Sequence, residues 1–241
     1  MAASITWLGH ATVRLVLPDG RVAIIDPWLT DNPACPAALK HPSRCDIILV
    51  THGHYDHVAD IKGLVERFDP LVLGNYELCT ILGKQIGSGR FEGMNTGGTL
   101  NIEGLSATLT KAFHSSSIDA GNAPVYAGMP NGWVVQVPGL ATIYDAGDTD
   151  VFGDMELIAK LYEPKVCILP IGDRYTMGAR GAALAAQMLQ PTAIIPVHYK
   201  TFPLLAQSAD EFRAALPPKL AKCLLTPDVG QDVAWTAGGA G

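Results

Sequence analysis

The 241-residue chain is 48% hydrophobic and 17% charged, which excludes extensive disorder and is enough for one large domain or two small ones. Its formal net charge of −6, without any run of Lys or Arg, argues against a nucleic-acid partner. The five cysteines are scattered and show no C-x-x-C pair, so neither a disulfide framework nor a thiolate zinc site is indicated. No apolar stretch approaches the roughly 20 residues that cross a bilayer, and Met1–Trp7 lacks the basic start and apolar core of a signal peptide. We therefore expect a cytoplasmic protein with no membrane partner.

The first apolar segments predict a β-meander. Ser4–Leu8 and Ala11–Leu17 have the pattern of strands, and Pro18-Asp19-Gly20 is a turn signal that leads into Val22–Ile25. Asp46–Val50 is a continuous apolar run that predicts a buried strand.

After this strand, helical and extended patterns alternate. Apolar residues at helical spacing predict helices over Ala59–Phe68, Glu77–Leu82, Met155–Leu161, Ala182–Leu189 and Glu211–Leu216. Strands are predicted at Leu71–Leu73, Leu105–Phe113, Trp133–Val137, Ala141–Tyr144, Val166–Leu169 and Ala193–Val197. No low-complexity linker divides the chain, so we expect a single mixed α/β domain over residues 1–241, with an Ala/Gly-rich tail that frays from about Thr236.

The strand at Asp46–Val50 is followed by an H-x-H-x-D-H cluster, formed by His52, His54, Asp56 and His57. Three imidazoles and a carboxylate at this spacing are typical of metal ligands, and a solvated polar loop is the weaker alternative. Such ligands suit zinc, iron, manganese or nickel, and the residue types alone do not choose among these metals.

Three later strands also end in candidate ligands: His114, Asp148 and His198. Taken singly, each histidine is more typical of a surface or core position, and Asp148 could form a turn or cap the following helix. Because sites collect at the carboxyl ends of strands in open α/β sheets, we expect the four loops to converge on one edge. Convergence would supply nitrogen and oxygen ligands for two metals.

These motifs resemble the metallo-β-lactamase superfamily. The H-x-H-x-D-H cluster matches its signature, and His114, Asp148 and His198 follow in the order of its later motifs. Further segments resemble a branch of small bacterial metal-dependent hydrolases, which is similar to ascorbate-6-phosphate lactonases and, more distantly, to N-acyl-phosphatidylethanolamine phospholipase D. These segments are Trp7–Thr12, Ile25–Trp28, Leu169–Asp173, Tyr175–Gly178 and Pro196–Tyr199.

The resemblance implies an αββα sandwich, in which two β-sheets lie face to face with helices outside. It also implies that His52, His54 and His114 bind one divalent metal, that Asp56, His57 and His198 bind a second, and that Asp148 bridges them. Two-metal hydrolytic sites hold their ions about 3.5–4 Å apart, and a metal-bound hydroxide is the nucleophile. Asp56 and Asp148 are thus the predicted catalytic residues, with Asp56 orienting the hydroxide and zinc as the first choice of metal.

Further residues are predicted around this centre. Asp26 follows a strand and precedes Pro27, where it could accept a ring N–H from a ligand histidine, brace Thr51 or simply form a turn. Substrate contacts are predicted for His10, Asp173, Arg174 and Lys200, with a structural role as the alternative for His10. The two cations would favour an anionic small molecule.

The chain departs from the branch at three positions. Asp145 stands where the branch usually has histidine, and Arg174 and Lys200 stand where it often has asparagine. A specific substrate therefore does not transfer from relatives.

The sequence thus predicts a dinuclear hydrolase acting on an ester, lactone or phosphodiester of a small molecule. A phospholipase D-like phosphodiesterase and a non-catalytic metal-binding sensor or scaffold are the alternatives, and a homo-oligomer is left open.

Overall fold

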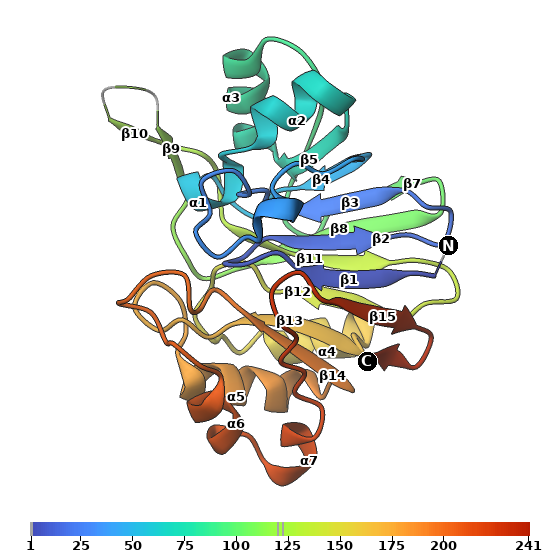
Figure 1. Cartoon of the computed structure of the whole chain (residues 1–241), viewed down its shortest axis with the longest axis vertical. Helices are drawn as coiled ribbons and strands as arrows, with labels where there is room; N and C mark the ends of the chain where they lie inside the picture. The colour runs from blue at the N-terminus through green and yellow to red at the C-terminus, as the bar shows by residue number, and fades with distance from the viewer. Residues whose placement is uncertain (1, 120, 122) are drawn as a thin grey trace.

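Two mixed β-sheets lie face to face in the computed structural model, which describes residues 2–119, 121 and 123–241 (Figure 1). Helices cover the outer face of each sheet. The αββα sandwich implied by the resemblance is therefore confirmed.

Within the described residues, the larger sheet has eight strands in the order β16-β15-β1-β2-β3-β4-β5-β6. Their bounds are Gly239–Ala240 (β16), Asp232–Thr236 (β15), Ser4–Trp7 (β1), Val13–Val16 (β2), Val22–Ile25 (β3), Ile47–Leu49 (β4), Leu71–Asn75 (β5) and Arg90–Met94 (β6). The pairs from β16 to β3 are antiparallel, as a meander requires, and those from β3 to β6 are parallel.

The smaller sheet has six strands among the described residues, in the order β14-β13-β12-β11-β8-β7. Their bounds are Ala193–Val197 (β14), Val166–Pro170 (β13), Ile143–Asp145 (β12), Asn131–Gln136 (β11), Leu105–Lys111 (β8) and Thr99–Ile102 (β7). The pairs β12–β13 and β13–β14 are parallel, and the other pairs are antiparallel. A separate hairpin of β9 (Ser117–Asp119) and β10 (Pro124–Tyr126) projects from the body of the molecule (Figure 1).

The helices form the outer layers. Their bounds are Tyr55–Val58 (α1), Ile61–Phe68 (α2), Tyr76–Ile86 (α3), Met155–Tyr162 (α4), Ala179–Leu189 (α5), Asp210–Ala215 (α6) and Pro218–Ala221 (α7), with a 3₁₀ turn at Ala37–Leu39. Helices α2 and α3 pack on the larger sheet, and α4 and α5 pack on the smaller one. No helix in the described part of the chain has both the length and the apolar composition that spanning a membrane requires.

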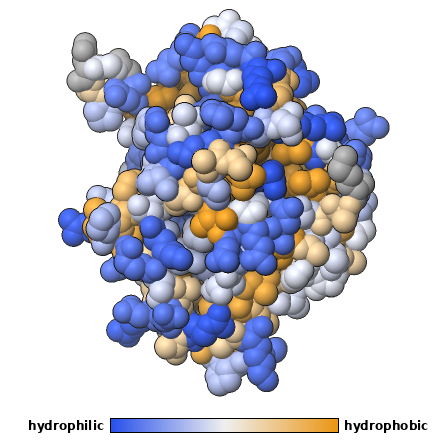
Figure 2. Space-filling model, in the orientation of Figure 1, coloured by the Kyte–Doolittle hydropathy of each residue, from blue (hydrophilic) through white to orange (hydrophobic). Residues whose placement is uncertain are grey.

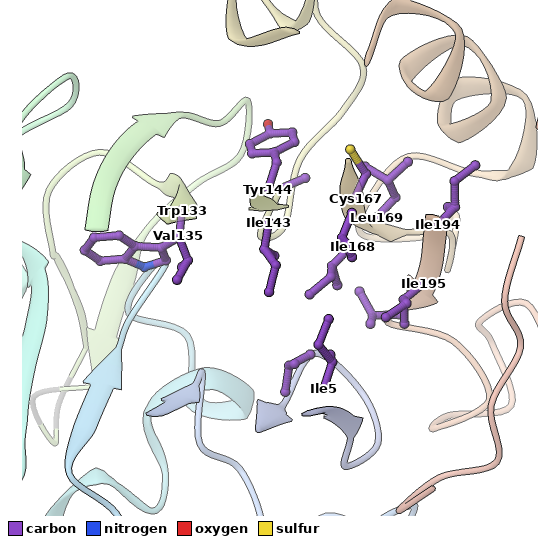
Figure 3. Close-up of a cluster of buried hydrophobic side chains, with 14 of the residues drawn as sticks. Ile5, Trp133, Val135, Ile143, Tyr144, Cys167, Ile168, Leu169, Ile194 and Ile195 are labelled. Atoms are coloured by element: carbon purple, nitrogen blue, oxygen red, sulfur yellow. The ribbon is translucent and has the colours of Figure 1, made fainter. Parts of the chain in front are cut away.

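The main core fills the space between the sheets. Because side chains alternate across a strand, one set of strand residues faces the opposite sheet and the other set faces a helical layer. Figure 3 shows Ile5 of β1 facing Ile168 and Ile195 of the other sheet, while Tyr144 and Cys167 point away from it. Strand β4 is buried on both faces, which explains its uninterrupted apolar run.

Several elements differ from the sequence prediction. The helix predicted over Ala59–Phe68 is α2, which begins two residues later at Ile61, and the short helix α1 just before it was not predicted. Helix α3 extends beyond the predicted Glu77–Leu82. The tail predicted to fray from Thr236 instead forms β16, which pairs Trp235 with Ala240. A glycine with φ of 143° at position 239 permits the tight reversal that brings the tail back.

Candidate metal centre

The predicted ligands gather at one end of the sandwich. His52, His54, Asp56 and His57 follow β4 of the larger sheet, whereas His114, Asp148 and His198 follow β8, β12 and β14 of the smaller sheet. The four loops were expected to converge on one edge, and their side chains do come together, although the strands belong to two different sheets. They meet because the two facing sheets present these strand ends at the same end of the sandwich.

The Asp148 carboxylate stands among the histidines. Its Oδ2 lies 3.1 Å from His198 Nε2, 3.4 Å from His57 Nε2, 3.6 Å from His114 Nε2 and 3.9 Å from His52 Nε2. Asp148 is 3% exposed, so this negative charge is removed from water. One oxygen thus faces nitrogen atoms from three separate loops.

His52, His54 and His114 form one compact group whose ring nitrogens lie within 4.8 Å of one another. His52 Nε2 is 2.9 Å from His54 Nδ1, and the other His52 nitrogen, Nδ1, is 3.0 Å from the Thr51 hydroxyl. His54 and His114 are half-buried and His52 is buried. The group therefore has an inner, rigid member and two members toward the surface.

A second group joins Asp56, His57 and His198 with His10, again with ligand atoms within 4.8 Å of one another. His10 Nε2 lies 2.8 Å from Asp56 Oδ2, and His10 Nδ1 lies 3.0 Å from the Thr201 hydroxyl. His10 is fully buried and has a left-handed backbone with φ of 52°. The residue predicted to contact substrate is thus in contact with a predicted ligand.

Asp26 braces the loop that carries the cluster. Its Oδ1 accepts the Thr51 backbone N–H at 2.8 Å, and its Oδ2 accepts the Thr51 hydroxyl at 2.5 Å and His57 Nδ1–H at 2.7 Å. With Nδ1–H donated to Asp26, the neutral His57 ring has its Nε2 lone pair directed at the site. Both predicted contacts of Asp26 are made, and its φ of 48° also fits the predicted turn.

Burial keeps most of the imidazoles neutral. Desolvation lowers the pKa of His52 well below 6.5, lowers that of His54 and His114, and lowers that of His10 to about 4. A neutral imidazole is the form that binds metals, because one ring nitrogen then has a free lone pair.

The electrostatic potential favours a cation between the two groups. Burial alone would lower the pKa of His57, but Asp148, Asp26 and Asp56 outweigh it and raise this pKa well above 6.5. Burial would likewise raise the pKa of Asp148, but His198 and His57 hold it well below 3.8. Positive charge is therefore stabilised where these side chains meet.

Unpaired polar atoms show that the cluster fits a metal. His57 Nε2 and Asp148 Oδ1 are buried and lack a hydrogen-bond partner among the described residues. Leaving such atoms unpaired costs about 1–3 kcal/mol each, and a bound cation would satisfy both. The nitrogen and carboxylate donors suit divalent zinc, manganese, iron or nickel.

Asp145, which replaces the usual histidine, lies behind the site. It is 3% exposed, and its Oδ1 accepts the Gly147 N–H at 2.9 Å. Burial and the nearby Asp26 raise its pKa to about 8. The departure therefore introduces a carboxyl group that the fold favours in its neutral form.

The remaining predicted substrate residues lie at the surface. Asp173, Arg174 and Lys200 are exposed, and Asp173 turns the chain with φ of 70° after β13. Asp173 lines a small depression together with Asp150 and Arg180. The structure does not place these three among the side chains that surround Asp148.

Sequence reasoning missed the residues that hold the ligands. The Thr51 and Thr201 hydroxyls contact His52 and His10, while Trp28 and Phe202 pack against the His10 ring with centroids 5.2 and 5.6 Å away. Thr51 could have been found from its place directly before the H-x-H-x-D-H cluster. Thr201 and Phe202 carried no such signal, because the chain separates them from His10 by about 190 residues.

Comparison with known proteins accounts for this arrangement. A family model for the β-lactamase superfamily domain matches residues 21–199, which is most of the chain. The chain belongs to the metallo-β-lactamase superfamily.

Relatives in this superfamily match nearly end to end. A metal-dependent hydrolase of Koribacter versatilis is 44% identical over 207 residues, covering 86% of this chain and 88% of that protein. Another from Azorhizobium caulinodans is 44% identical over 234 residues, covering 94% and 98%. A solved metallo hydrolase from the archaeon Ignicoccus hospitalis is 31% identical with a TM-score of 0.85, covering 97% and 98%. This metallo-β-lactamase-fold chain is therefore a metal-dependent hydrolase with a His/Asp cluster able to bind metal.

Proposed function

We propose that this chain is a dinuclear hydrolase that cleaves an ester, lactone or phosphodiester of a small molecule. It would hold two divalent metal ions, with zinc as the first choice. The observation that carries the proposal is the position of Asp148 Oδ2, 3.1–3.9 Å from Nε2 of His198, His57, His114 and His52. A carboxylate placed between two groups of donors is the arrangement that a bridged pair of ions requires.

The donors divide naturally into two sets. His52, His54 and His114 would hold one ion, Asp56, His57 and His198 would hold the other, and Asp148 would contact both. When bound, the ions supply Lewis acidity toward the substrate oxygen and toward water. Asp26 keeps His57 Nδ1 protonated and so directs its Nε2 lone pair into the site.

Asp56 and His10 form the pair that handles the proton. Neutral His10 donates its Nε2–H to Asp56 Oδ2 while its Nδ1 accepts the Thr201 hydroxyl. The Asp56 side chain is 28% exposed, so its carboxylate reaches the open side of the site and can orient an attacking water. Burial would raise the pKa of Asp56, but His57 and His10 hold it below 3.8, which keeps it ionised as an acceptor.

The reaction is a simple hydrolysis. The water oxygen bonds to the carbonyl carbon or the phosphorus, the bond to the leaving oxygen breaks, and that oxygen takes up the proton that the water loses. His52, His57 and His198 are at most 1% exposed, so the inner side of the site is shielded from bulk water.

Restoring metal to chelator-treated protein tests the proposal. Hydrolysis of 4-nitrophenyl acetate, a panel of lactones and bis(4-nitrophenyl) phosphate is measured while zinc or manganese is added in steps. We expect activity to rise until about two equivalents are bound, and we expect Asp56→Asn to have lower activity even at saturating metal. Saturation at one equivalent would contradict the dinuclear site.

The same panel separates the alternatives. Greater turnover of bis(4-nitrophenyl) phosphate than of lactones would favour the phosphodiesterase, and no turnover of any member with both ions bound would favour the sensor or scaffold. Arg174 and Lys200 stay predicted contacts for an anionic substrate, and their exposure allows charge reversal without disturbing the core.

A further inference from the structure

A cavity of about 630 Å³ opens directly beside the metal centre. It lies between the β9–β10 hairpin and helices α2 and α3, and the residues Gly53, His54 and Tyr55 form its inner end. Figure 2 shows apolar surface between the projecting hairpin and the helical layer. Ligand-binding cavities typically enclose about 300–1,000 Å³, so this one has the size of a small-molecule site.

The walls are mainly aliphatic side chains. Val58, Ile61, Leu82, Ile86 and Ile118 line the cavity, and Ile61, Leu82 and Ile118 are buried members of the core beneath α2 and α3. Side chains fixed in a packed core keep their positions, so the apolar wall exists before a ligand arrives. An aliphatic or aromatic group would leave water on entering it, which is favourable.

The hairpin wall is fastened to the ligand loop. The Ser116 hydroxyl accepts the Gly53 backbone N–H at 3.2 Å and donates to the Ala127 carbonyl at 3.3 Å. A Cβ on Gly53 would lie 3.0 Å from Ala127 Cβ and 3.0 Å from the Ser117 carbonyl oxygen. The cavity is therefore held at a fixed distance from His54, which faces His52 Nε2 at 2.9 Å.

Polar residues also line the cavity, among them Lys62, Gln85, Ser117 and Asp119. Lys62 and Gln85 are exposed lining residues, and Gln85 Nε2 donates to the Asp119 carbonyl at 3.4 Å. A ligand with one polar end at the metals and an apolar body would thus find complementary surface along its whole length.

We propose that this cavity binds an apolar group of the substrate, namely a medium-length aliphatic chain next to the scissile bond. The inference rests on the proposed function, because the polar end of the substrate must lie at the metal centre. It narrows the substrate class to chain-bearing molecules and places the chain against α3 and the hairpin.

Binding of octanoate and acetate to the metal-loaded protein tests the proposal by calorimetry. Both have a carboxylate, but only octanoate has a chain for the cavity. Each fully buried methylene strengthens binding about fourfold, so three buried methylenes predict a Kd about sixtyfold lower for octanoate. Equal dissociation constants, within about threefold, would overturn the proposal.

Variants in the wall locate the chain. Ile86 is a half-buried residue at the end of α3, and Ile86→Trp fills the cavity while Ile86→Asp makes its wall polar. We expect both variants to abolish the octanoate preference and to leave acetate binding unchanged. Leu157→Trp, on the exposed face of α4, is the matched control. Circular dichroism confirms folding, and a preference that survives in both folded Ile86 variants would contradict the proposal.

Turnover separates this inference from the proposed function. The two substrates are 4-nitrophenyl acetate and 4-nitrophenyl octanoate. The octanoate ester should have the higher kcat/KM, and Ile86→Trp should remove that advantage. If neither ester is hydrolysed but octanoate still binds more tightly than acetate, the proposed ester hydrolysis is contradicted and the chain-binding cavity is retained. If acetate ester is hydrolysed without any chain preference, the cavity proposal alone fails.

Discussion

Replacing Asp26 with asparagine tests how the metal centre is held in place. The carboxylate is 1% exposed and accepts three hydrogen bonds, from the Thr51 N–H, the Thr51 hydroxyl and His57 Nδ1–H. Asparagine has a similar shape and tolerates the left-handed backbone at this position, where φ is 48°. Its amide oxygen can still accept the Thr51 N–H, but its NH₂ group cannot accept from His57.

The expected loss has two parts. Hydrogen bonds to charged groups contribute about 1.5–3 kcal/mol each, so losing two would cost about 3 kcal/mol at the lower figure. The lower figure is appropriate because burial raises the pKa of Asp26, and the neutral amide avoids the desolvation that this rise reflects. A hydrogen bond from the non-ligating ring nitrogen of a ligand histidine typically contributes about 10–100-fold to metal affinity. The metal affinity of the site that contains His57 should therefore fall by about that factor.

Two measurements check these numbers. Urea unfolding of metal-free protein gives the stability change, and competition with a chromophoric chelator gives the affinity for each metal equivalent. Asp46→Asn is the matched control, because Asp46 also accepts a backbone N–H, from Val22 at 2.7 Å, but lies away from the ligands. The reasoning is refuted if Asp26→Asn binds both equivalents within about twofold of the unmodified protein.

Three further predictions concern the surrounding residues. Because burial raises the pKa of Asp145 to about 8, its folded form retains a proton that the unfolded chain releases near pH 4, so the contribution of Asp145 to the stability of the metal-free protein falls as pH rises from about 4 to 8. The free energy of unfolding, measured by urea titration, should fall between about pH 5 and pH 8 by up to about 4 kcal/mol less in Asp145→Asn than in the unmodified protein. An equal pH dependence in the two proteins would contradict this. His10→Gln should lower kcat about 10–100-fold with KM and metal content nearly unchanged, with exposed His41→Gln as control, whereas loss of metal would assign His10 a ligand role. Gly147→Ala should destabilise by about 2 kcal/mol or more in thermal unfolding, because its Cβ would lie 2.6 Å from the Asn131 carbonyl oxygen at φ of 61°; Gly153→Ala, with open space around it, should not.

Strong hydrophobic patterns made much of the fold predictable. The continuous apolar runs at β4, β13 and β14 reflect strands buried on both faces, and the strand boundaries there differ from prediction by at most one residue. Strand β6 was missed because Arg90–Met94 is an exposed edge whose sequence shows no apolar alternation. Strand β15 was missed because it is defined by pairing with β1, more than 200 residues earlier in the chain.

The candidate site was predictable where it depends on residue type and local spacing. The H-x-H-x-D-H cluster, His114, Asp148 and His198 are recognisable because each directly follows or lies close to a strand end. The residues that contact and position the ligands were harder to predict. The contact of His10 with Thr201, for example, joins residues about 190 positions apart in the chain. The apolar cavity was also invisible, because its walls come from α2, α3 and a hairpin whose proximity only the fold creates.

Metal stoichiometry measured on the purified protein and on Asp148→Ala tests the central claim most directly. The account predicts about two divalent ions per chain, and loss of at least one of them in Asp148→Ala, because this carboxylate faces both groups of donors. His41→Ala, an exposed histidine outside both groups, should retain both ions. Equal metal content in the unmodified protein and in folded Asp148→Ala would contradict the account.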